Sequence, residues 1–211
     1  MYISKLTVNP ADRGVQRDLG RIYEMHRTVM TAFPAARDGG PGRVLYRVDL
    51  PRRASTRLPE VLVVSEHEPD WSALANRTGY LAVPPEHKSY RPAVTLGQVL
   101  RFRLRANPTV RRDGKRLGLY REPEQLEWLK RKAREHGFQI LRVESSSEGK
   151  ALGRAGDAAG GERTLTFCSV LFEGLLRVAD PAVFESALST GVGAGKGLGF
   201  GLLTAAPGAI P

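Results

Sequence analysis

The chain has 211 residues, of which 41% are hydrophobic and one is cysteine, so its composition argues against a disordered protein and excludes an internal disulfide or a thiolate metal site. No apolar run reaches the roughly 18 residues of a membrane span, and the N-terminus lacks the apolar core of a signal peptide, so we expect a cytoplasmic protein. The net charge of +10 and the pI of about 10.2 favour a nucleic-acid-binding protein over a generally basic one.

The first part of the chain shows strand and helix patterns in the order β-α-β-β-α-β. Residues 2–9 alternate as a half-buried strand does, and Asn9 and Pro10 end this strand. The other predicted elements are a helix over 17–33, strands over 44–48 and 61–65, a short helix that begins at 69–71, and a strand over 80–83. Residues 84–92 have the composition of a linker.

The second part of the chain repeats this order. A helix is predicted between Pro123, at a first helical position, and Gly137, at a position just past a helix end. The other predicted elements are strands over 98–106, 138–143, 165–178 and 202–204, a helix over 181–188, and a mobile loop over 145–162. Two βαββαβ units in tandem predict an α+β fold of two ferredoxin-like domains, 1–88 and 93–211.

Arginines alternate along the predicted strand over 98–106. Arg101, Arg103 and Arg105 project on one face of the strand, while the apolar residues between them pack on the other. Three like charges on one face repel one another unless solvent, acidic neighbours or phosphates take up the charge. The pattern favours contact with RNA or DNA, and a solvated edge strand protected by its charge is the alternative.

A basic turn follows this strand. Asp113 and Gly114 form a hairpin signal, and Arg111, Arg112, Lys115 and Arg116 flank it. Four cations at the tip of a protruding ribbon suit a nucleic-acid groove, because arginine matches both phosphates and guanine edges. We therefore predict that these four residues bind nucleic acid.

A glycine-rich segment occupies residues 191–201. It matches neither G-x-G-x-x-G nor the phosphate loop that ends in Gly-Lys-Ser/Thr, so binding of ATP or NAD is not supported and no cofactor is expected. Its small residues leave backbone N–H groups accessible to a phosphate backbone. Gly193, Gly195, Gly197 and Lys196 are therefore predicted to contact nucleic acid, although glycine runs also occur in flexible tails.

His26 is the candidate catalytic residue. It lies in the apolar arc of the helix predicted over 17–33, where a structural core histidine is the alternative interpretation. Tyr23 lies one turn earlier and Arg27 lies next to His26. Histidine suits proton transfer near neutral pH, tyrosine can polarise a hydroxyl, and a cation can offset the charge of a transition state. Because no His/Asp/Glu cluster has the spacing of a metal site, we do not expect a two-metal nuclease; if the chain cleaves RNA, His26 would carry the proton transfer without a metal.

These motifs together resemble those of the CasE family, the precursor-CRISPR-RNA endoribonucleases of type I-E systems. The FRLRANP string and the terminal glycine loop are the specific part of the match. Tyr23 and His26 alone would not identify the family. The matching segments are 6–10, 23–27, 102–108 with 114–116, and the glycine loop with its G-φ-G ends at 191–193 and 199–201.

The resemblance implies tandem ferredoxin-like domains that bind the stem-loop of a CRISPR repeat and cleave at the 3′ base of the stem. It also implies a 2′,3′-cyclic phosphate product and an enzyme that stays on the crRNA as a subunit of the type I-E surveillance complex. His26 would be the principal proton-transfer residue and Tyr23 its helper. The alternatives are a non-catalytic RNA-binding subunit of the same fold, and a scaffold whose basic surface neutralises a protein partner.

Overall fold

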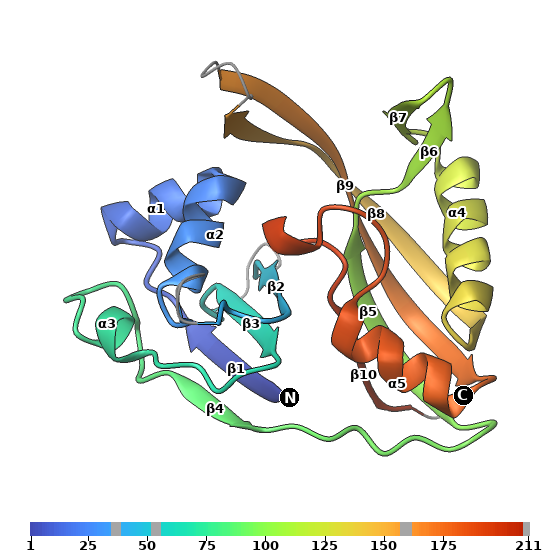
Figure 1. The fold of residues 1–211 in the computed structure, drawn as a ribbon, viewed down its shortest axis with the longest axis horizontal. Coiled ribbons are helices and arrows are strands. Elements are labelled where there is room, and N and C mark those ends of the chain that lie inside the picture. The colour runs from blue at the N-terminus through green and yellow to red at the C-terminus, as the bar shows by residue number, and fades with distance from the viewer. Residues whose placement is uncertain (35–38, 52–55, 157–161, 209–211) are drawn as a thin grey trace. The chain divides into compact units, whose positions relative to one another are not determined.

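Two four-stranded sheets organise the chain, one in each of two units (Figure 1). The computed structural model describes residues 1–34, 39–51, 56–156 and 162–208. The first unit comprises Met1–Arg91 together with Leu152–Thr164 and Gly197–Gly199, and the second comprises the remaining residues. The main change of unit along the chain therefore falls between Arg91 and Pro92.

The sheet of the first unit has the strand order β2-β3-β1-β4. Strand β1 (Tyr2–Thr7) pairs antiparallel with β3 (Glu60–Ser65) and with β4 (Glu86–Ser89), and β3 also pairs antiparallel with β2 (Val44–Asp49). This order, with helices between β1 and β2 and between β3 and β4, is the ferredoxin-like plan that the sequence predicts.

Two helices replace the single helix predicted over 17–33. Helix α1 (Arg13–Gly20) begins early because the Asp12 side chain accepts a backbone hydrogen bond from the first turn at 2.9 Å. Helix α2 (Ile22–Met30) follows after Arg21, whose φ of −138° and ψ of 106° are extended. The apolar periodicity continues across this break, so the sequence pattern conceals it.

The predicted strand over 80–83 is wrong. Leu81 makes an isolated bridge with Val8, and β4 forms within residues 84–92, the predicted linker. All four residues of β4 are exposed, so this edge strand has no alternation of apolar and polar side chains. Its pairing with β1 defines it as a strand, and sequence periodicity does not report pairing.

The core of the first unit lies between its sheet and its helices. Met25 and Val29 of α2 pack in one cluster with Tyr46 of β2 and with Leu74 of α3 (Ser72–Ala75), the predicted short helix. All four side chains are almost fully buried, at 4% exposure or less. Burial on this scale stabilises the unit by about 2 kcal/mol per large side chain and fixes α2 against the sheet.

The sheet of the second unit has the strand order β10-β5-β9-β8. Strand β5 (Val99–Ala106) lies inside it and pairs antiparallel with β9 (Glu162–Val178) and with β10 (Leu203–Pro207). Strand β8 (Phe138–Gly156) lies next to β9. The order repeats that of the first unit, and so confirms the duplicated ferredoxin-like plan.

Helices α4 (Glu122–Glu135) and α5 (Pro181–Thr190) contribute to the core of the second unit. Both begin with a proline in the first turn, and the predicted glycine past α4, Gly137, has a φ of +73°. The helices are therefore close to their predicted bounds. Among the described helices, none is both long and apolar enough to cross a bilayer.

A separate hairpin of β6 (Thr109–Arg112) and β7 (Lys115–Gly118) is inserted between β5 and α4, beside the helix (Figure 1). Its two turn residues, Asp113 and Gly114, have φ values of +50° and +74°, as a type I′ turn requires. The hairpin predicted from this dipeptide is therefore confirmed.

The mobile loop predicted over 145–162 is wrong where the structure describes it. Residues 145–156 continue β8 and Glu162 begins β9, so the two strands form a long ribbon (Figure 1). Residues 157–161 lie outside the described part. Glycine and serine favour loops, but cross-strand pairing overrides this weak local preference.

Candidate active site and nucleic-acid interface

Helix α2 places the two candidate catalytic side chains next to each other. Tyr23 and His26 are three residues apart, which sets them side by side on a helix surface. Their ring centroids lie 6.5 Å apart with the planes at 76°, an edge-to-face arrangement. Arg27, on the same helix, has a 74% exposed side chain and lies 3.6 Å from Glu24.

The imidazole of His26 is half-buried and incompletely paired. Its Nδ1 atom is inaccessible to solvent and has no hydrogen-bond partner in the described part of the chain. Burial lowers the pKa of His26, and a hydrogen bond with the backbone of Gly197 opposes this effect. Buried ring nitrogens are normally paired in a folded protein, so an unpaired one calls for an explanation, and a catalytic role is one such explanation.

A buried carboxylate ties α2 to its surroundings. Asp18 of α1 has a fully buried side chain and accepts hydrogen bonds from the hydroxyls of Thr28, at 2.6 Å, and Tyr80, at 2.8 Å. Arg17 lies 2.8 Å away and pairs with the other carboxylate oxygen. The sequence offers no signal for this network, because Thr28 and Tyr80 lie 10 and 62 residues from Asp18.

The three arginines of β5 are in different environments. Arg101 is exposed, whereas Arg103 pairs with Glu173 and Arg105 with Glu148, each at 2.6 Å. Acidic neighbours therefore take up the charge of two of the three, which is one of the possibilities that the sequence leaves open.

The hairpin concentrates unneutralised charge. In its register Arg111 faces Arg116 and Arg112 faces Lys115. All four side chains are exposed, and none of them makes an ion pair with a described residue. Like charges directly opposite each other destabilise a hairpin, so an anionic ligand would relieve the repulsion.

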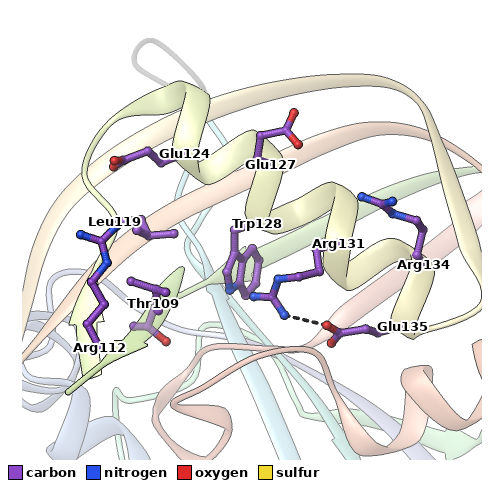
Figure 2. A pocket seen from close by; sticks show the side chains of 10 residues that line it. Thr109, Arg112, Leu119, Glu124, Glu127, Trp128, Arg131, Arg134 and Glu135 are labelled. Atoms are coloured by element: carbon purple, nitrogen blue, oxygen red, sulfur yellow. Dashed lines mark hydrogen bonds and ion pairs between the residues drawn. The ribbon is translucent and has the colours of Figure 1, made fainter. Parts of the chain in front are cut away.

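A groove runs between the hairpin and α4. Figure 2 shows Trp128 between the hairpin residues Thr109 and Arg112 and the ion pair of Arg131 with Glu135, which measures 2.6 Å. Trp128 is 4% exposed and stacks on Phe172, so it forms part of the core rather than an open stacking platform. The groove walls are charged and its floor is apolar.

An adjoining groove of about 450 Å³ is strongly basic. Three of its residues, Arg131, Lys132 and His136, lie at the end of α4 and were missed by the sequence analysis, although the basic run over 130–134 hints at them. Burial lowers the pKa of His136, and the nearby charges of Lys132 and Lys196 lower it further. The predicted residues that line this groove are Arg111, Arg116, Gly193 and Lys196.

The glycine segment is a structured loop. Within the second unit, Asn107 of the FRLRANP string forms a bridge with Ala194, and the backbone N–H of Val192 donates to the Gly201 carbonyl at 2.8 Å. Gly193 and Gly195 have φ values of +86° and +82°, which favour glycine. Gly197 is exposed, in a 3₁₀ turn that spans Lys196–Leu198. These contacts rule out a flexible tail.

The described residues contain no group of three or more His, Cys, Asp or Glu side chains that could hold a metal ion.

Comparison with known proteins points to one family. The profile of the family described as "CRISPR associated protein" matches residues 1–207. The chain is 42% identical to the CRISPR-associated endoribonuclease Cse3 of Thermus thermophilus, over 98% of this chain and all of that protein.

It is also 30% identical to the CRISPR system Cascade subunit CasE of Escherichia coli, over 98% of this chain and all of that protein. Among solved structures, a CRISPR endoribonuclease Cse3 bound to a 19-nucleotide RNA superposes with a TM-score of 0.84. That comparison covers 98% of this chain and all of the other, at 42% identity.

Proposed function

This chain belongs to the CasE family of CRISPR-associated endoribonucleases, and on that premise we propose that His26 carries the proton transfer that cleaves CRISPR repeat RNA. The enzyme binds the stem-loop of the repeat and cuts precursor CRISPR RNA at the 3′ base of the stem. It then stays on the mature crRNA as a subunit of the type I-E surveillance complex. Its place of action is the cytoplasm, where the transcript is made.

The proposed chemistry uses only the RNA, the side chains of the protein and solvent water. Neutral His26 takes the proton of the 2′-hydroxyl, whose oxygen attacks the adjacent phosphorus. The bond to the 5′-oxygen breaks, a 2′,3′-cyclic phosphate forms, and the departing oxygen takes a proton from solvent. The imidazolium then returns its proton to solvent. Tyr23 positions the reacting hydroxyl, and Arg27 offsets the charge of the phosphorane.

The RNA contacts follow the distribution of charge. The four hairpin cations that face one another in register bind the phosphates of the RNA stem. The exposed backbone of Gly197 lets the phosphate chain approach closely. We assign the catalytic helix to an N-terminal domain over 1–88, and the hairpin and glycine loop to a C-terminal domain over 93–211. The full set of proposed RNA-binding residues is Arg27, Arg101, Arg103, Arg105, Arg111, Arg112, Lys115, Arg116, Lys196, Gly193, Gly195 and Gly197.

The observation that carries the catalytic assignment is the half-buried imidazole of His26 beside Tyr23, with an unpaired Nδ1 and a pKa that burial lowers. The test is cleavage of the cognate repeat RNA in excess EDTA on a denaturing gel, with wild type and His26→Ala side by side. We expect wild type to cut one phosphodiester and to leave a 2′,3′-cyclic phosphate. His26→Ala should bind the RNA equally well and leave it intact.

The other outcomes separate the alternatives. Equal cleavage by both proteins would show that His26 is a structural core residue and that another residue carries the catalysis. Tight binding without cleavage by either protein would identify a non-catalytic RNA-binding subunit. Activity that EDTA abolishes would overturn the metal-free mechanism.

A further inference from the structure

The orientation of His26 needs an explanation, because no described residue forms a hydrogen bond with its Nδ1 atom. In many active sites a carboxylate or carbonyl fixes one ring nitrogen and leaves the other for the substrate. Here Nδ1 has no partner among the described residues. The imidazole is therefore held by the placement of α2 and by its contact with the Gly197 backbone.

Tyr46 fixes the beginning of α2. Its hydroxyl donates a hydrogen bond to the Ile22 carbonyl at 3.1 Å. Ile22 is the first residue of α2, and in helical geometry its carbonyl also accepts the backbone N–H of the residue four positions later, which is His26. The Tyr46 side chain is 2% exposed and lies in the core of the first unit. The hydroxyl thus reaches, from β2, the carbonyl that supports the His26 backbone.

Gly199 lies close to the ring of Tyr46. It is buried and has a φ of +85°, and a methyl group added there would lie 3.1 Å from Cε2 of the Tyr46 ring. Gly197 and Gly199 belong to the first unit with α2 and β2. One turn of the glycine loop therefore lies close to two side chains of the first unit, to Tyr46 at Gly199 and to His26 at Gly197.

We propose that Tyr46 and Gly199 are positioning residues that hold His26 in its reactive orientation. Tyr46 fixes the start of α2 through its hydrogen bond to the Ile22 carbonyl. Gly199 allows the turn to pack closely against Tyr46, and this packing places the Gly197 backbone beside the imidazole. This proposal rests on the catalytic role of His26 proposed above. It assigns the tip of the glycine loop a role in catalysis beyond phosphate contact.

The test compares Tyr46→Phe, Gly199→Ala and a control, Gly97→Ala. Gly97 has a φ of +79°, close to that of Gly199, but no atom lies within 4 Å of an added methyl group. It therefore reproduces the backbone strain without the contact. Single-turnover cleavage is measured with saturating repeat RNA from pH 5 to 8.5, affinity is measured with RNA that lacks the attacking 2′-hydroxyl, and folding is monitored by thermal unfolding.

We expect Tyr46→Phe to slow cleavage about tenfold, with RNA affinity unchanged within about twofold, because small misplacements of a catalytic group are costly. Its pH–rate midpoint should rise, since a loosened imidazole is better hydrated and burial is what lowers its pKa. Gly199→Ala should slow cleavage at least as much, and Gly97→Ala should cleave like wild type.

Wild-type cleavage with an unchanged pH profile in Tyr46→Phe would overturn the proposal. So would equal losses in Gly199→Ala and Gly97→Ala, which would indicate strain alone, or a loss confined to RNA affinity, which would indicate an RNA contact. Failure of wild type to cleave would instead overturn the proposed function, and the positioning role with it.

Discussion

His26 illustrates how a single residue acquires reactivity from its surroundings. A buried nitrogen without a partner disfavours the charged imidazolium, so the resting side chain is neutral at neutral pH. The burial that makes His26 resemble a core residue is therefore also what prepares it to accept a proton.

The pH dependence of cleavage tests this view. Because burial lowers the pKa of His26 below 6.5, the neutral form predominates above that value. A base must be neutral to act, so the single-turnover rate should be constant from about pH 7 to 8.5 and should fall as the pH drops through the lowered pKa, approaching tenfold per unit. A rate that increases toward acid pH would instead indicate that His26 acts as the acid.

At the scale of secondary-structure elements, α1 and α2 are joined by a buried polar network instead of continuing as one helix. Asp18 accepts bonds from Thr28 and Tyr80 on one oxygen and pairs with Arg17 on the other. The break at Arg21 lets α2 take its own direction, and Asp18 connects it to α1. Asp18 is thus a structural support for the helix that carries His26.

Asp18→Asn should destabilise the protein by about 2 kcal/mol, because an amide cannot accept bonds on both sides as the carboxylate does. Urea unfolding measures the change. Asp12→Asn is the matched control on the same helix, since asparagine caps a helix as well as aspartate and little change is expected. Equal stability of the two variants would contradict the role assigned to Asp18.

The hairpin is the second element with a separable role. Alanine at Arg111 or Arg116 should weaken binding of the repeat RNA and reduce the salt dependence of the affinity by about one unit of log–log slope for each phosphate that the variant no longer neutralises. Filter binding between roughly 50 and 300 mM salt, where counterion release governs the affinity, measures both effects. Lys130, which pairs with Glu127 on α4, is the control, and its replacement by alanine should change neither the affinity nor the slope. An unchanged slope in the hairpin variants would exclude phosphate binding by the hairpin.

For the whole molecule, the net charge of +10 favours retention of RNA after cleavage. Cutting at the base of the stem leaves the stem itself bound, so the product should remain on the enzyme. With a tenfold excess of repeat RNA, product should therefore level off at about one molecule per enzyme. Sustained linear turnover on a denaturing gel would show that the product is released and would argue against a subunit that stays with the crRNA.

The sequence by itself determined the features that depend on local patterns. These include the duplicated βαββαβ order, the hairpin at Asp113 and Gly114, and the proximity of Tyr23 and His26 on one helix. Helical and strand periodicities act over a few residues, and a turn needs only two. A pattern of this kind is therefore readable before any tertiary contact is known.

The tertiary structure decided everything that depends on a partner distant in the chain. It split the first helix, made β4 an edge strand and extended β8 and β9 through residues predicted as a loop. It paired Arg103 and Arg105 with carboxylates, and it brought Gly199 against Tyr46. Neither an ion pair nor a packing contact has a period in the sequence, because both are set by how strands and loops assemble in three dimensions.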